Sequence, residues 1–144
     1  MATPLTTRSD WLKANPPGAA LLGQTLAGLA QRVRGGEDFH YAVREFLDEF
    51  ALRGDDRSRT EAIEGRPESI EDLRQDAYLG ALAEHLAAVH DLARPAWSVE
   101  PDRFLDSFWF VSEVVGFRAV AIAQAPAAFR RRGIFVPERS LHRV

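Results

Sequence analysis

The stretch "DFHYAVREFLDEFA", residues 38–51, has the most regular hydrophobic pattern in the chain. Its apolar residues recur at intervals of three and four, which places them on one face of an α-helix with charged residues opposite. Asp38 stands at the expected N-cap, because its carboxylate can accept a hydrogen bond from a free N–H group of the first turn. Gly54 ends the pattern. The stretch predicts an amphipathic helix and indicates a fold built from helices.

A second helix is predicted before this stretch. It begins at Pro16 or Pro17, since proline is tolerated in the first turn, and it ends at Gly35 and Gly36. The two helices are joined by so short a turn that they are expected to pack as an antiparallel hairpin. The apolar face of this earlier helix is formed by four residues at helical spacing: Leu22, Leu26, Leu29 and Val33.

A long third helix is predicted after a polar loop. Residues 55–68 contain Gly65 and Pro67, so they are expected to form a loop with one helical turn around Ala62 and Ile63. Ser69 followed by Asp72 then resembles a capping box, which opens a helix that runs to about Leu92. The predicted core side of this helix carries Leu79, Leu82, Leu86 and Val89.

The C-terminal third is rich in aromatic residues. The stretch "PAWSVEPDRFLDSFWFV", residues 95–111, is expected to hold a short helix from Pro101 and to pack its rings over the helices. Alternatively, part of this cluster stays exposed and binds a protein. Residues 113–124 fit either a helix, which we favour, or a strand. Pro126 begins a last short helix that ends at Gly133, followed by the extended segment "IFV".

These patterns predict an all-α fold, a helical bundle with an aromatic-rich C-terminal third. The alternative is an α+β fold, in which "IFV" belongs to a small strand pair. At 144 residues the chain has the length of one domain, so residues 1–144 are expected to form it, with residues 1–15 as a flexible N-terminal arm.

Composition excludes several classes of site. The chain has no cysteine, which excludes disulfides, thiolate zinc sites and a cysteine nucleophile. It has no apolar run long enough for a membrane span and no apolar signal core at its start, so a cytoplasmic protein is expected. The net charge of −3 argues against a general nucleic-acid binder. No residue pattern indicates a metal ion or another cofactor.

The stretch "PAAFRRRGIFV", residues 126–136, contains the densest basic cluster, Arg130–Arg132. The structural interpretation is that cations occupy the last turn of a short helix, where the helix dipole favours them. Three successive residues also fan over about 200° of a helix, so they cannot all face one phosphate strand. The alternatives are contact with nucleic acid or with an acidic protein partner.

No arrangement of residues indicates catalysis. His85 and His90 are five positions apart, which leaves their rings about 140° apart on a helix and unable to share a metal ion. Acidic pairs such as Asp55 and Asp56 stand in no known metal or phosphate motif. We therefore expect that the protein is not an enzyme. A site assembled around His40 or His85 from distant residues is a less favoured alternative.

Four segments resemble a helical domain that is common in actinobacteria. They are "FHYAVREFLDEF" (39–50), "AYLGALAEHLAAVHDLARPAW" (77–97), "DRFLDSFWFV" (102–111) and "APAAFRRRGIFV" (125–136). That domain occurs with helix-turn-helix regulators and beside nucleotidyltransferase-like genes in toxin–antitoxin arrangements. The resemblance spans residues 38–144 and implies a cytoplasmic, non-enzymatic, antitoxin-like or regulatory protein. Its expected partner is another protein, such as a toxin or regulator encoded nearby. The resemblance assigns no functional residues to this chain.

The predicted function is therefore a non-catalytic protein-interaction module. The alternative is a nucleic-acid-binding transcriptional regulator that uses Arg130–Arg132. Aromatic and arginine side chains are enriched at binding hot spots, and the C-terminal third contains both. The predicted partner-binding residues are accordingly Trp97, Phe108, Trp109, Arg130, Arg131 and Arg132.

Overall fold

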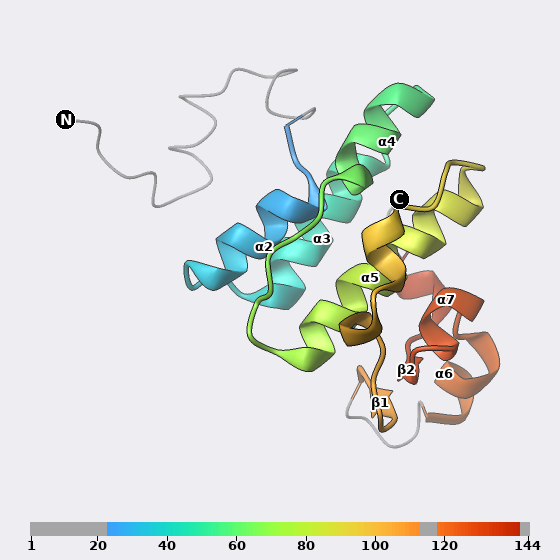
Figure 1. Ribbon diagram of the computed structural model, residues 1–144. Coiled ribbons are helices and arrows are strands. Elements are labelled where there is room, and N and C mark those ends of the chain that lie inside the picture. Colours follow the sequence, from blue (N-terminus) through green and yellow to red (C-terminus); the bar gives the residue numbers. More distant parts are fainter. Residues whose placement is uncertain (1–22, 113–117, 142–144) are drawn as a thin grey trace.

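The computed structural model describes residues 23–112 and 118–141, which form helices and one small parallel sheet (Figure 1). Helix α2 (Leu26–Arg34) and helix α3 (Phe39–Phe50) pack against each other across a short turn, as the predicted hairpin requires. The Asp38 carboxylate accepts a hydrogen bond from the Tyr41 N–H at 2.9 Å. The N-cap and the amphipathic helix predicted from residues 38–51 are thus confirmed.

Two helix starts differ from the prediction. Residues 23–25 are not helical, and α2 begins at Leu26, because the Thr25 hydroxyl accepts from the Gly28 N–H at 2.9 Å and caps the helix there. The predicted start at Pro16 or Pro17 and the N-terminal arm, residues 1–15, lie outside the described residues. Helix α5 (Leu73–Val89) is capped by Asp72. Ser69 is not the cap, since its hydroxyl donates to Asp76 at 2.7 Å.

The loop predicted for residues 55–68 is mainly a helix, α4 (Asp56–Glu64). Its polar sequence gave little sign of a helix, because only Ala62 and Ile63 are buried. The Asp55 carboxylate nevertheless accepts from the Ser58 N–H at 2.7 Å and fixes the first turn. A good cap and one apolar contact are sufficient here, so the prediction of a loop was wrong.

The C-terminal third contains short elements. They are the 3₁₀ helices η2 (Ala96–Val99), η3 (Pro101–Arg103) and η5 (Glu138–Leu141), the helices α6 (Arg118–Gln124) and α7 (Ala127–Arg130), and the strands β1 (Trp109–Phe110) and β2 (Ile134–Phe135). Residues 118–124 are helical, as we favoured, while residues 113–117 lie outside the described residues. The helix predicted from Pro101 is only a single 3₁₀ turn.

The two strands change the fold class. β1 and β2 pair in parallel, with Trp109 opposite Ile134 and Phe110 opposite Phe135. The "IFV" segment is thus part of a strand pair, as in the α+β alternative, although its partner is β1 and residues 118–124 are helical. The all-α prediction does not describe the whole fold. Parallel strands need a crossover connection, which α6 and α7 provide. Strands of two residues have no periodicity that a sequence could reveal.

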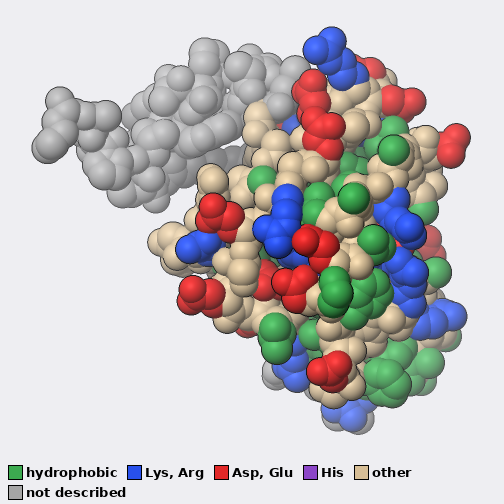
Figure 2. Space-filling model, in the orientation of Figure 1, with side chains coloured by type: hydrophobic (Ala, Val, Ile, Leu, Met, Phe, Trp, Pro, Cys, Tyr) green, Lys and Arg blue, Asp and Glu red, His purple; other side chains and the backbone are tan. Residues whose placement is uncertain are grey.

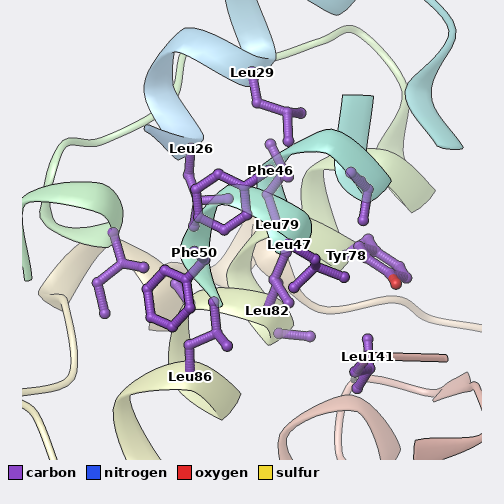
Figure 3. Close-up of a cluster of buried hydrophobic side chains, with 14 of the residues drawn as sticks. Leu26, Leu29, Phe46, Leu47, Phe50, Tyr78, Leu79, Leu82, Leu86 and Leu141 are labelled. Carbon is purple, nitrogen blue, oxygen red and sulfur yellow. The ribbon is translucent and has the colours of Figure 1, made fainter. Parts of the chain in front are cut away.

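Helix α5 lies at the centre of the core (Figure 3). Leu79 and Leu82 are fully buried, and Leu86 is nearly so, as predicted. Val89 is 53% exposed, because it is the last residue of α5 and projects beyond the core. The labelled core side chains in Figure 3 come from α2, α3, α5 and η5: Leu26, Leu29, Phe46, Leu47, Phe50, Tyr78, Leu79, Leu82, Leu86 and Leu141.

A second, smaller apolar cluster lies beneath α6. Ala121 and Ala125 pack there against Phe135, and Phe110 covers its edge. The outer face of α6 is exposed, including Val120 and Ile122. Across the described part of the chain, no helix combines the length and the apolar character that a membrane span requires.

Candidate functional site

Strand β1 and the residue before it present three consecutive aromatic side chains at an open hollow of about 370 Å³. We call it the aromatic hollow; its lining residues are Arg74, Phe108, Trp109, Phe110, Ser112 and Arg118. Phe108 is 73% exposed, which is unusual for so large an apolar side chain. In Figure 2, hydrophobic and basic side chains gather over the part of the molecule where Figure 1 places β1 and α6.

Two of the three rings of the hollow rest on β2. Phe110 stacks on Phe135 with centroids 5.1 Å apart, and Phe108 meets the same ring edge to face at 5.3 Å. Gly133 has a φ of +79° and lies directly under Phe108. A Cβ atom added at Gly133 would lie 3.5 Å from the Phe108 ring. Glycine adopts this backbone conformation without steric cost. The turn at Gly133 therefore lets β2 begin beneath Phe108 and hold it at the surface.

Two arginines flank the rings of the hollow. The guanidinium carbon of Arg74 lies 5.6 Å from the centroid of Trp109, and that of Arg118 lies 5.2 Å from the centroid of Phe110. Both side chains are exposed. Within residues 23–112 and 118–141, neither forms an ion pair, whereas most of the other arginines do. The hollow thus combines exposed apolar area with two charges that no described carboxylate neutralises.

The three arginines of the cluster Arg130–Arg132 differ in burial. Arg132 is 1% exposed, and its guanidinium donates to the Glu84 carboxylate and to the backbone carbonyls of Ser98 and Ala128 at 2.6, 2.6 and 2.7 Å. The ring of Phe104 covers it at 4.6 Å. Arg132 therefore fastens the C-terminal third to α5, and its side chain offers no surface to a partner.

The other two members of the cluster face outward. Arg131 forms an ion pair with Glu84 and lies over Phe104. Arg130 donates to the Ala125 carbonyl at 3.0 Å, close to the end of α6. Arg131 and Arg132 thus share Glu84 and the Phe104 ring, whereas Arg130 points to α6. The predicted helical fan does not hold for Arg131 and Arg132, because α7 ends at Arg130. None of the three arginines lines the aromatic hollow.

Trp97 is also buried. It is 6% exposed, its indole N–H donates to the Ile63 carbonyl at 3.1 Å, and Arg103 covers its ring at 4.9 Å. Of the six predicted partner-binding residues, only Phe108 and Trp109 therefore line the hollow. Prediction from sequence missed Phe110, Arg74 and Arg118. Phe110 belonged to the same aromatic cluster, but no local signal connects Arg74 on α5 with β1.

Glu84 is the acidic centre that holds the arginines. Burial alone would raise the pKa of its carboxyl, but the hydrogen bond and charge of Arg132, together with the charge of Arg131, outweigh burial and lower it. Arg94 also reaches this carboxylate, at 3.2 Å. A group whose pKa is lower in the folded protein stabilises the fold above its unfolded pKa, and that stabilisation disappears as the pH falls.

We expect the stability difference between the wild-type protein and Glu84→Gln to be largest near neutral pH. It should shrink as the pH falls through and below about 4.5, since the unfolded carboxyl takes up its proton first. Urea unfolding of both proteins across this pH range measures the difference. A difference that stays constant with pH would contradict the assigned role of the Glu84 charge.

The histidines occupy separate surroundings. His85 is buried with its ring 5.9 Å from Phe129, whereas His90 lies 5.3 Å from Phe50. Their rings thus diverge, as their spacing predicted. In the described part of the chain, no three side chains of the types His, Cys, Asp and Glu lie close enough to hold one metal ion.

Comparison with protein-family models, curated proteins and solved structures finds no match to this chain.

Proposed function

We propose that this protein is a non-catalytic interaction module that binds another protein through the aromatic hollow. The observation that carries the proposal is the exposure of Phe108 in a hollow that it shares with two arginines that have no described carboxylate partner. Exposed apolar groups of this kind typically mark binding surfaces, and aromatic and arginine side chains contribute most of the energy there. The α6 face beside the hollow, with Val120 and Ile122 exposed, extends the apolar area.

The proposed biological role is antitoxin-like or regulatory, in the cytoplasm. It rests on the resemblance of residues 38–144 to an actinobacterial helical domain found with regulators and toxin–antitoxin loci. The expected partner is a toxin or regulator encoded nearby. Arg130 and Arg131 remain candidates for a second contact, because both are exposed.

The alternative, a nucleic-acid-binding regulator that uses Arg130–Arg132, receives less support. Arg132 is buried and Arg131 is paired with Glu84, so the cluster presents less free charge than its sequence implied. A net charge of −3 further weakens attraction for a polyanion. Steep salt dependence of binding would still distinguish this function.

The test is quantitative capture from native lysate with nuclease present, using wild-type protein and Phe108→Ser as baits. We expect recovery of one defined protein to fall about tenfold with Phe108→Ser, because a central apolar contact is lost. Leu52→Ser is the matched control, since Leu52 is 66% exposed and lies outside the hollow. Equal recovery on both variants would contradict the proposal, as would a partner that nuclease removes.

A further inference from the structure

We propose that the aromatic hollow selects partner segments in which acidic residues stand on both sides of a large apolar side chain. The inference rests on the proposed function and specifies the chemistry of the partner. Phe108 supplies the apolar platform, and Arg74 and Arg118 supply the charges.

The two arginines lie on opposite sides of β1. Trp109 and Phe110 are consecutive in the strand, so their side chains point to opposite faces. Arg74 lies over Trp109 and Arg118 lies over Phe110, so one charge belongs to each face. A partner segment that pairs a carboxylate with each arginine must therefore cross the strand. Its two carboxylates are then separated by at least one other side chain.

The exposed ring of Phe108 favours an apolar partner side chain beside these carboxylates. This ring shares the face of Phe110, because the two residues are two positions apart in extended chain. Both rings rest on Phe135, which is buried, so this platform is fixed rather than free to turn inward. A large aliphatic or aromatic side chain of the partner would cover it and remove apolar area from water.

The ion pairs of the described residues show how these two arginines differ from most others. Most other arginines of the described residues form ion pairs within the protein, for example Arg53 with Glu49 and Arg34 with Glu68. Arg74 and Arg118 lie over rings instead, and a guanidinium over a ring keeps its donors available to a carboxylate. Because the net charge is −3, acidic segments gain from these local contacts rather than from a general attraction.

Single-stranded nucleic acid is the competing ligand, since it also combines stacking with arginine contacts. It needs a basic track that follows the backbone over several nucleotides. The hollow offers two arginines within an acidic chain, which fits a short peptide segment better. An oligonucleotide is therefore included in the test as an outcome that would overturn the proposal.

The test is selection of a random peptide library displayed on phage, with the intact chain as target. On the wild-type protein, we expect enriched peptides to carry Asp or Glu on both sides of Leu, Phe or Trp. The double variant Arg74→Glu/Arg118→Glu should select Lys or Arg at those positions and keep the apolar residue. Arg44→Glu/Arg139→Glu is the matched control on exposed arginines outside the hollow, and it should select the same peptides as the wild type.

Affinities of one enriched peptide complete the test. By fluorescence anisotropy, Arg74→Ala/Arg118→Ala should weaken binding about tenfold and Phe108→Ser at least as much. Peptides that depend on Phe108 but carry no acidic residues would overturn this inference and leave the proposed function standing. Peptides that bind Phe108→Ser unchanged would overturn both. Tighter binding of a labelled oligo-dT, lost in Arg74→Glu/Arg118→Glu, would replace both with nucleic-acid recognition.

Discussion

Replacing Arg132 by alanine is expected to lower the free energy of unfolding by about 3–5 kcal/mol, because it removes one member of a buried ion pair. The guanidinium is 1% exposed and donates to Glu84 and to the carbonyls of Ser98 and Ala128. Without it, these acceptors lose a buried donor that water cannot easily replace. The free energy of unfolding of a small domain is about 5–15 kcal/mol, so the variant would lose a large fraction of its stability.

The burial of Arg132 makes this loss specific to one member of the triplet. Arg130 is exposed and donates only to carbonyls near α6, so Arg130→Ala should cost less than about 1 kcal/mol. Urea unfolding, followed by circular dichroism, measures both variants. Similar losses for the two variants would show that Arg132 is not the residue that joins the C-terminal third to α5.

The same triplet shows how far sequence reasoning reached. Helical spacing predicted that the three side chains would diverge, but α7 ends at Arg130, and Arg131 and Arg132 both reach Glu84. Which of them is buried depends on Glu84 and Ser98, which lie on other elements far away in the sequence. Long-range partners of this kind leave no local pattern. The prediction therefore assigned all three arginines to a surface, although Arg132 belongs to the interior.

The fold shows the same division between local and long-range causes. Helix α3 was predictable because Asp38 and the apolar residues of one face act within a single stretch. Helix α4 was missed because its cap, Asp55, supports a sequence with little hydrophobic character. Strand β1 was missed because it exists only through pairing with β2, and the aromatic hollow depends on that pairing. Phe108 was selected from composition, and its position at the surface required the structure.

Replacing Gly80 by valine is expected to destabilise the protein by about 3 kcal/mol, through overpacking between α5 and η3. A Cβ atom at Gly80 would lie 2.9 Å from the Cβ of Arg103 and 3.0 Å from the Ser98 carbonyl oxygen. Neither neighbour can move easily. Arg103 is 2% exposed and donates to the carbonyls of Asp76 and Pro67, while the Ser98 carbonyl accepts from Arg132.

This close approach explains a glycine in the middle of the central helix. Alanine at an ordinary helix position would be more favourable than glycine by about 1 kcal/mol. Gly80→Ala should nevertheless destabilise the protein, because the clash exceeds that gain. Thermal or urea unfolding gives the sign directly, and Ala88→Val on the exposed side of α5 is the control for adding volume to this helix.

The result for Gly80→Ala separates two explanations of how α5 and η3 are held. If the variant is less stable than the wild type, the contact of η3 with the bare helix backbone determines the position of Arg103 and, above it, Trp97. The near-ultraviolet circular dichroism of the protein, to which Trp97 contributes, should then change in Gly80→Val and stay unchanged in Ala88→Val. If Gly80→Ala is more stable by the helix propensity alone, η3 adjusts without cost, and the Arg103 hydrogen bonds rather than close packing hold the C-terminal third on α5.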